Sequence, residues 1–391
     1  MSTNPTIIHS NNDTAIKRSK KFVVVHFIHT MAYGGIETTI INWLTTIDTN
    51  QFEPYLICFA NPGQTEQPFI EAATRAGLPV KTIPWSRRKP IFSAAFKLKK
   101  MLKAVNADIL HTHNTYADIV GAVCAKIHTI KTLTTFYVWA NFGWKRLMLQ
   151  HLNIIAVKGY DGISAHSEQT LKETINRFSN NDIKLIISGF KSNNINYTSE
   201  ERLQKRREAN IADDDIVLVN VARLYPEKAQ DFLLHAFKKI LAHNPKCKLW
   251  ILGIGPLEQE LRALCTALNL DHAVTFKNFV SELHLLLPLV DIQVHPSHFE
   301  GVPISILSGM AAGLPIIATD VGGLPEVLKP NKTGILVPEN DMEKFIKEVT
   351  HLIFDEQFRK NIGTQAKLFI ENEYSIETAT LMLQQTYLDL V

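Results

Sequence analysis

Short apolar segments alternate with helical segments along most of the chain, and this alternation limits the possible folds most strongly. The first series includes expected strands at 21–29, 80–83 and 132–136, with helical stretches between them. A second series begins with the apolar run at 216–222. Strands that are separated by helices pair in parallel, because each helix returns the chain to the start of the next strand. We therefore expect an α/β protein with two doubly wound domains, which bind ligands beyond the carboxyl ends of their strands.

Changes in composition divide the chain into segments. The first 20 residues are polar, lack the apolar segment of a secretion signal and are predicted to be a disordered tail. A polar, charged stretch at about 191–215 interrupts the alternation. We expect a first domain over 21–200, a second domain over 201–375 and a C-terminal helix over 376–391.

Overall composition narrows the class of protein. Of the 391 residues, 46% are hydrophobic and 20% are charged, as is typical of a globular chain. No apolar run approaches the roughly 18 residues that a membrane span needs. The four cysteines are scattered and show no CxxC spacing. We expect reduced thiols in a cytoplasmic protein.

Residues 296–326, PSHFEGVPISILSGMAAGLPIIATDVGGLPE, are the most informative segment. An apolar run at 290–295 leads into a turn at 300–302, and Pro303 can open a helix because its missing N–H would have no partner there. Free backbone N–H groups at such a helix start attract anions. The carboxylate of Glu300 cannot bind phosphate and is suited to accept hydrogen bonds from neutral hydroxyls. Phosphate together with hydroxyls indicates a nucleotide sugar.

This segment resembles the donor-binding element of family 4 glycosyltransferases in its Glu-Gly at 300–301, its Met-Ala-Ala-Gly-Leu-Pro at 310–315 and its Gly-Gly-Leu-Pro-Glu at 322–326. The resemblance implies the GT-B fold, in which two Rossmann-like domains face each other across a cleft and the C-terminal helix packs back on the first domain. It also implies a retaining enzyme that moves a hexose-type sugar from a nucleotide-diphosphate sugar to a glycan or lipid-linked acceptor. Such enzymes act in cell-surface polysaccharide or glycoconjugate synthesis.

Two cations follow the first strand of the second domain. Arg223 and Lys228, in Val-Ala-Arg-Leu-Tyr-Pro-Glu-Lys at 221–228, resemble the pair that holds the donor diphosphate in this family. Fixed cations offset the negative charge of a departing nucleoside diphosphate where metal is absent. The acidic run at 213–215 lies in the expected linker rather than at a strand end. We therefore expect no metal and no other cofactor.

The resemblance assigns further donor contacts. Glu300 would hold the donor sugar, with the backbone of Gly301, Val302 and Ile304 beside the diphosphate. Gly34 and Gly35 begin a Gly-Gly-Ile-Glu sequence after the first strand and would shape the cleft wall, because glycine lets a backbone approach a ligand closely. The same four residues would equally suit an ordinary connection from strand to helix.

His111 and His113 end a first-domain strand and resemble the family's His-x-His on the acceptor side of the cleft. Two histidines at this spacing could also bind zinc, but no third ligand is apparent nearby in the sequence. Either histidine could instead be a structural residue.

Two positions depart from the family pattern. Ser308 stands eight residues after Glu300, where the family usually has a second glutamate that holds the ribose. Losing one charged hydrogen bond would weaken donor binding by roughly 10- to 150-fold. The candidate catalytic residues are Glu300, Arg223, Lys228 and Tyr137. Tyr137 stands where the family has its cleft histidine, and it is a poor base because its reference pKa is about 10. A catalytically degenerate protein that binds a sugar nucleotide or a partner is therefore an alternative, as is a sugar-nucleotide epimerase of the same fold.

Residues 72–107 contain nine basic residues and no acidic ones, interleaved with aromatic and aliphatic side chains. A basic helix with apolar residues resembles an anchor for anionic membranes, so residues 81–103 are a candidate contact with the inner face of the membrane. An ordinary amphipathic helix with solvated lysines would have the same composition. No nucleic-acid-binding motif is present, so we expect no nucleic acid partner.

Overall fold

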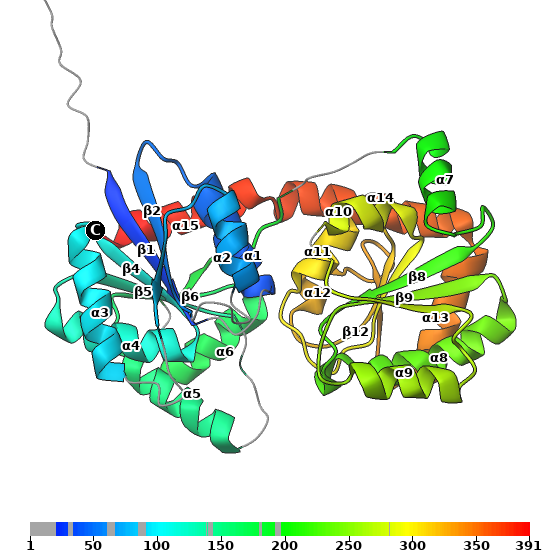
Figure 1. Cartoon of the computed structure of the whole chain (residues 1–391), viewed down its shortest axis with the longest axis horizontal. Coiled ribbons are helices and arrows are strands. Elements are labelled where there is room, and N and C mark those ends of the chain that lie inside the picture. The colour runs from blue at the N-terminus through cyan, green and yellow to red at the C-terminus, as the bar shows by residue number, and fades with distance from the viewer. Residues whose placement is uncertain are drawn as a thin grey trace, which may run out of the picture.

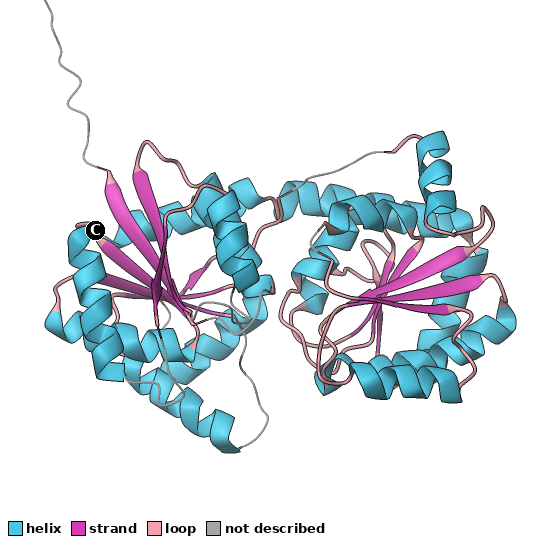
Figure 2. Ribbon diagram, in the orientation of Figure 1, coloured by secondary structure: helices cyan, strands magenta, loops and turns pink. Residues whose placement is uncertain are grey.

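The protein consists of two lobes, each built on a parallel sheet with helices on both faces (Figure 1, Figure 2). The computed structural model describes residues 21–29, 34–60, 67–84, 91–137, 139, 144–179, 182–191, 197–280 and 282–391. The predicted tail at 1–20 and the basic residues 87–89 lie outside this description. The predicted two-domain GT-B architecture is confirmed.

The first domain contains a seven-stranded sheet in the order β3-β2-β1-β4-β5-β6-β7. Its strands are β1 (Phe22–Ile28), β2 (Phe52–Phe59), β3 (Val80–Ile83), β4 (Ile109–His113), β5 (Lys131–Phe136), β6 (Gly162–Ala165) and β7 (Lys184–Leu185). Its helices are α1 (Gly35–Thr46), α2 (Gln67–Arg75), α3 (Ile91–Ala104), α4 (Thr115–Ile127), α5 (Trp144–Val157) and α6 (Glu168–Phe178). The central strands β1 and β4 are buried on both faces, which is why their residues are mostly apolar without strict alternation.

The second domain contains a six-stranded sheet in the order β10-β9-β8-β11-β12-β13. Its strands are β8 (Ile216–Val221), β9 (Cys247–Leu252), β10 (Val274–Lys277), β11 (Ile292–His295), β12 (Ile316–Thr319) and β13 (Ile335–Val337). Its helices are α7 (Ser199–Glu208), α8 (Gln230–His243), α9 (Glu258–Ala267), α10 (Leu283–Leu286), α11 (Ile304–Ala311), α12 (Leu324–Val327) and α13 (Met342–Phe354), with 3-10 turns η1 (Pro226–Lys228) and η2 (Leu287–Leu289).

Strand order reverses between β1 and β4 in the first sheet, and between β8 and β11 in the second. Ligands of doubly wound sheets bind at such switch points, beyond the carboxyl ends of the strands. The Gly34-Gly35 loop follows β1, and the loop with Arg223 and Lys228 follows β8. The turn at 300–302 follows β11. The candidate donor residues thus lie at the two switch points.

The polar stretch at 191–215 contains helix α7, which sequence analysis did not predict. Thr198 and Glu201 form a capping box at its start. The guanidinium of Arg206 is buried and pairs with Asp291 at 3.0 Å, which attaches α7 to the second domain. The capping box was the local signal for this helix, but the charged composition concealed it.

The chain ends in α14 (Glu356–Glu373) and α15 (Ile376–Leu390), which run from the second lobe back to the first (Figure 1). Helix α15 packs against α1, and the backbone N–H of Asp48 donates to Gln384 at 2.6 Å. Tyr387 of α15 is buried inside the first domain. The prediction that the C-terminal helix packs back on the first domain is confirmed.

Candidate functional site

Glu300 is the centre of a buried ionic cluster in the second domain. Its Oε1 accepts hydrogen bonds from Nζ of Lys228 at 2.6 Å and from Nε2 of His295 at 2.5 Å. Burial raises the pKa of Glu300, but the charge of Lys228, the electrostatic interaction with His295 and the hydrogen bonds from both outweigh burial and lower the pKa to about 2. Glu300 is therefore an anion at neutral pH. Both described hydrogen bonds fall on Oε1, which leaves Oε2 to accept from a ligand.

Two glycines hold the backbone of Glu300 from behind. Gly322 has φ +60°, and a Cβ there would lie 1.8 Å from the carbonyl oxygen of Glu300. The N–H of Gly323 donates to the same oxygen at 3.3 Å. No larger residue could occupy position 322 without moving the turn. The Gly-Gly of the 322–326 motif therefore supports the turn that carries Glu300.

Helix α11 begins directly after the turn. Pro303 was predicted to be the first residue of the helix, but it is the N-cap residue. Its backbone is extended, at φ −71° and ψ 134°. Gly313 has φ +75° just past the end of α11, a left-handed conformation that commonly ends a helix. The hydroxyl of Ser308 donates to the carbonyl of Ile304 at 2.8 Å, so its proton is used within the helix.

The turn at 300–304 meets the first domain closely. A Cβ on Gly301 would lie 2.9 Å from Nε2 of His166 and 3.3 Å from the carbonyl oxygen of Tyr137. A Cβ on Gly35 would lie 3.8 Å from Cγ1 of Ile304. The structure thus brings Gly35 and Tyr137 of the first domain to Gly301 and Ile304 of the second. At the same loop, the N–H of Gly34 donates to its neighbour Glu37 at 3.1 Å.

Glu326 ties the two domains together. Its carboxylate accepts from the backbone N–H groups of Glu168 at 2.8 Å and Gln169 at 2.7 Å, at the start of α6. A carboxylate at a helix N-terminus is favoured by the helix dipole and by the free N–H groups. The last residue of the 322–326 motif therefore acts between the domains.

Comparison with known proteins matches each domain to one family model. Residues 201–369 match the model of group 1 glycosyl transferases, and residues 33–190 match the model of glycosyltransferase family 4. The chain belongs to the group 1 and family 4 glycosyltransferases. The predicted family is confirmed.

Relatives of this glycosyltransferase occur in several organisms. An uncharacterized glycosyltransferase of Methanocaldococcus jannaschii is 34% identical over 198 residues, which cover 49% of this chain and 50% of that protein. The Escherichia coli UDP-Gal:alpha-D-GlcNAc-diphosphoundecaprenol alpha-1,3-galactosyltransferase is 23% identical over 95% of this chain and 98% of its own length. The crystal structure of Anabaena HepE in complex with UDP and glucose has a TM-score of 0.83 and 19% identity, and the match covers 94% of this chain and all of that one. That likeness shows the shared fold.

Arg223 of the glycosyltransferase lies apart from the ionic cluster. Its side chain is 59% exposed, and Nη2 lies 3.8 Å from Oε1 of Glu227. The guanidinium also lies over the ring of Tyr225, 5.0 Å from its centre. Among the contacts described for Arg223, none reaches the turn at 301–304. Its role in donor binding stays a prediction.

The glycosyltransferase buries both predicted acceptor-side histidines completely. His111 and His113 have no exposed surface, and His26 of β1 lies beside them. The sequence showed no third ligand nearby, but the fold brings one, because nitrogen atoms of the three rings lie within 4.8 Å of one another. Sequence analysis missed His26 because β1 and β4 are neighbours only in the folded sheet. All six ring nitrogens have hydrogen-bond partners, so a metal ion could bind only by breaking those bonds.

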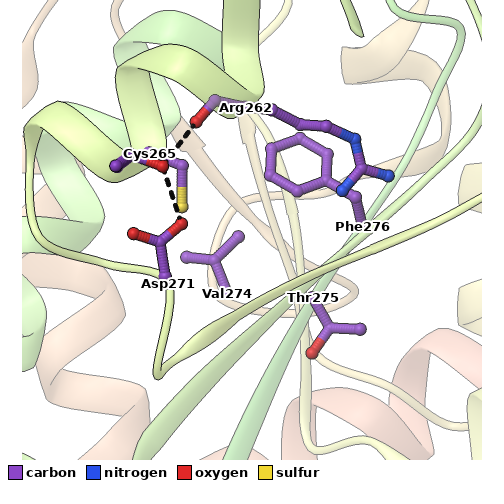
Figure 3. A pocket seen from close by; sticks show the side chains of 7 residues that line it. Arg262, Cys265, Asp271, Val274, Thr275 and Phe276 are labelled. Atoms are coloured by element: carbon purple, nitrogen blue, oxygen red, sulfur yellow. Dashed lines mark hydrogen bonds between the residues drawn. The ribbon is translucent and has the colours of Figure 1, made fainter. Parts of the chain in front are cut away.

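A pocket of about 430 Å³ lies elsewhere on the second domain of the glycosyltransferase, between α9 and β10 (Figure 3). The guanidinium of Arg262 covers the ring of Phe276 at 4.7 Å and pairs with Glu258 at 3.0 Å. Burial raises the pKa of the Cys265 thiol, so this thiol is a weak nucleophile. The pocket contains none of the predicted site residues. We place the candidate site at the domain interface, because the buried charges and the family motifs meet there.

Proposed function

We propose that this glycosyltransferase moves a hexose-type sugar from a nucleoside diphosphate sugar to a hydroxyl of a glycan or lipid-linked acceptor. Transfer retains the anomeric configuration and needs no metal or other cofactor. The buried Lys228–Glu300 pair carries the proposal, because it offers one cation for a diphosphate and one carboxylate for sugar hydroxyls. The HepE complex with UDP and glucose, and the naming of the E. coli relative for a diphosphoundecaprenol acceptor, support the same substrate classes.

Donor binding would place the diphosphate at the start of α11. The backbone N–H groups of Gly301 and Ile304 and the ammonium of Lys228 face its oxygens, and Arg223 turns from Glu227 to join them. Pro303 has no N–H, and the N–H of Val302 donates to Nε2 of His166 at 3.5 Å. Glu300 accepts hydrogen bonds from donor-sugar hydroxyls through Oε2. Ser308 accepts a ribose hydroxyl, since its own proton is donated to Ile304.

The chemical step breaks the bond from the anomeric carbon to the diphosphate oxygen and forms a bond to the acceptor oxygen on the same face. Glu300 has a pKa of about 2, so it is a poor base near neutrality. Burial raises the pKa of Tyr137 well above its ordinary value, so this phenol is also a poor base. We propose that the acceptor proton passes to the departing diphosphate oxygen, whose charge Lys228 and Arg223 stabilise.

Measured binding and turnover test this function. Thermal shifts or calorimetry with UDP-, GDP- and ADP-sugars identify the donor, and transfer or donor hydrolysis follows with the same donor. Activity is expected to disappear in Arg223→Ala plus Lys228→Ala. Donor binding without turnover in the unmodified protein would favour the catalytically degenerate alternative, and conversion of the donor without an acceptor would favour an epimerase.

Helix α3 supports a second proposal, that the first domain contacts the anionic inner face of a membrane and acts there as a peripheral cytoplasmic enzyme. Phe92 is 72% exposed and Phe96 is 61% exposed. Lys97, Lys100 and Lys103 on the same helix are also exposed. Helix α4 packs against both α3 and α5. Helix α5 also has exposed apolar side chains, at Leu147, Met148, Leu149, Leu152 and Ile155. Within the described residues, no helix is long and apolar enough to span a bilayer.

Liposome flotation tests membrane contact. Recovery is expected with anionic vesicles and not with neutral ones, and it is expected to fall in Phe92→Ser plus Phe96→Ser. Phe354→Ser is the matched control, because Phe354 is an equally exposed aromatic residue of the second domain. Equal recovery with both lipids, or none with either, would rule out electrostatic anchoring.

A further inference from the structure

Tyr137 is the first member of a buried chain of hydrogen bonds in the first domain. Its hydroxyl lies 2.9 Å from Nδ1 of His113. Nε2 of His113 lies 2.9 Å from Nδ1 of His26. Nε2 of His26 lies 2.6 Å from the hydroxyl of Tyr387 in α15. These four side chains connect the domain interface to the C-terminal helix.

The chain continues from Tyr387 to a backbone carbonyl. The hydroxyl of Tyr387 lies 2.8 Å from Nδ1 of His111, and Nε2 of His111 lies 2.7 Å from Oγ1 of Thr135. Oγ1 of Thr135 lies 2.7 Å from Oγ of Ser164. Ser164 donates to the carbonyl oxygen of Thr134 at 3.1 Å. The chain therefore ends on a group that can only accept.

The three imidazoles in this chain are neutral. Burial lowers the pKa of His26 to about 3. Burial and the neighbouring rings lower the pKa of His111 and His113 well below the ordinary value. Each ring therefore carries one proton, on one of its two nitrogens. Every hydroxyl in the chain also has one proton to donate.

The accepting carbonyl determines where each proton lies. Ser164 uses its proton on Thr134, so Thr135 must donate to Ser164. Thr135 then has no proton for His111, so Nε2 of His111 carries the proton and donates to Thr135. Nδ1 of His111 is left as an acceptor, and Tyr387 donates to it.

The same reasoning continues to the domain interface. Tyr387 already donates its proton to His111, so Nε2 of His26 donates to the Tyr387 oxygen. Nδ1 of His26 accepts from Nε2 of His113, and Nδ1 of His113 accepts from the hydroxyl of Tyr137. All the hydrogen bonds in the chain thus point in one direction.

We infer that this network commits the proton of Tyr137 to His113 and makes Tyr137 a hydrogen-bond acceptor at the domain interface, with Tyr387 as the positioning residue that maintains this polarity. Tyr137 retains 9% exposure, and its ring lies 5.3 Å from that of His166, which contacts Gly301. A ligand group that binds the Tyr137 oxygen must then donate a hydrogen bond. That this group is a hydroxyl of the donor sugar or of the acceptor substrate rests on the proposed function, whereas the direction of the hydrogen bonds in the network does not.

Tyr387 is decisive because it joins two halves that could otherwise have opposite polarity. Without its hydroxyl, His111 is still held by Thr135 and Ser164. His26 is no longer required to carry its proton on Nε2. It can then donate through Nδ1 to His113, which in turn donates through Nδ1 to Tyr137. Tyr137 would be free to donate its proton to a ligand.

Nitrogen-15 NMR of histidine-labelled full-length protein tests the polarity without any substrate. The three ring signals are assigned by replacing one histidine at a time. In the unmodified protein, all three rings are expected to be neutral and protonated on Nε2 between pH 5 and 8. In Tyr387→Phe, His26 and His113 are expected to gain the Nδ1-protonated form while His111 keeps its proton on Nε2. Tyr374→Phe, which removes the hydroxyl of another buried tyrosine near the C-terminus, is expected to change none of the three.

A second pair of variants covers failure of Tyr387→Phe to fold. Thr135→Val removes the acceptor of His111 and is expected to let all three rings take the Nδ1-protonated form, whereas Thr135→Ser is expected to preserve the unmodified pattern. The inference is overturned if any of the three rings carries its proton on Nδ1 in the unmodified protein. Unchanged tautomers in both Tyr387→Phe and Thr135→Val would overturn it too. The inference would also be overturned if the protein held one tightly bound zinc ion per chain and the ring signals were shifted by the metal.

Substrate analogues test the consequence for recognition. A fluorine in place of the recognised hydroxyl can accept but not donate, so the unmodified enzyme should have a higher KM for that deoxyfluoro sugar than for the parent sugar. Tyr387→Phe is expected to reduce this KM ratio, and Tyr374→Phe to leave it unchanged. An unchanged ratio in Tyr387→Phe would overturn the assigned role in recognition. If no sugar nucleotide binds at all, the proposed function fails while the NMR result still decides the polarity.

Discussion

Nζ of Lys228 lies 2.6 Å from Oε1 of Glu300, and the two side chains are only 13% and 6% exposed. The pair joins the loop after β8 to the turn after β11, two neighbouring strands at the switch point of the second sheet. Removing one member of such a pair leaves a buried charge without its partner. Stability and donor binding should therefore respond differently to changes at Lys228 and at the exposed Arg223.

Lys228→Ala is expected to lower the free energy of unfolding by about 3 kcal/mol, because Glu300 would keep its charge in a buried site. Adding Glu300→Gln removes that charge. The double variant should therefore lose less free energy of unfolding than the two single variants lose together, by about 1 kcal/mol or more. Urea unfolding of the four proteins measures this coupling. Strict additivity of the two changes would show that the pair does not interact in solution.

Arg223→Ala is expected to change the free energy of unfolding by less than about 0.5 kcal/mol, because its ion pair with Glu227 is exposed. Donor affinity should fall by roughly 10- to 150-fold if the guanidinium binds the diphosphate. Calorimetry with the donor identified by screening makes the comparison. Arg262→Ala is the matched control, since Arg262 is similarly exposed but lies at the α9 pocket. Equal donor affinity in both variants would remove Arg223 from the donor site.

Glu300 should make stability depend on pH in the acid range. Its pKa is about 2 in the folded protein and about 4.3 in an unfolded chain, so the folded state holds the proton less tightly. This stabilisation is complete above the unfolded pKa and is lost as the pH falls through the folded pKa. Below about pH 4 the unmodified protein should lose stability faster than Glu300→Gln, by up to about 1.4 kcal/mol per pH unit. Parallel pH profiles of the two proteins would show that Glu300 has an ordinary pKa.

Gly301→Ala should disturb the contact between the domains. The added methyl group would lie 2.9 Å from Nε2 of His166 and 3.3 Å from the carbonyl of Tyr137, so the turn must move away from the first domain. Transfer activity should fall at least tenfold while far-ultraviolet circular dichroism stays unchanged. Gly159→Ala is the control, because no atom lies within 4 Å of its added methyl group. Full activity in Gly301→Ala would mean that close approach at this turn is dispensable.

Local patterns predicted most elements well. The strand at 80–83 matches β3 in both bounds, and the strand at 132–136 matches β5 to within one residue, because hydrophobic period and flanking residues are local properties. Helix α7 was missed, since its charged residues hide a capping box and a buried arginine whose partner, Asp291, lies 85 residues away. A helix that is stabilised by distant partners leaves little trace in its own composition.

The sequence by itself determined the family, the two parallel sheets and the loops that end at their switch points, because motifs and periodicity survive without knowledge of the fold. Only the tertiary structure decided how these parts are used. It showed that Gly322 supports Glu300 and that Lys228 neutralises it. It also placed His26, 85 residues before His111, and Tyr387, 276 residues after it, in one hydrogen-bond chain. The physical reason is that the direction of each buried hydrogen bond depends on every partner in the hydrogen-bond chain. Strand pairing and helix docking determine which residues those partners are.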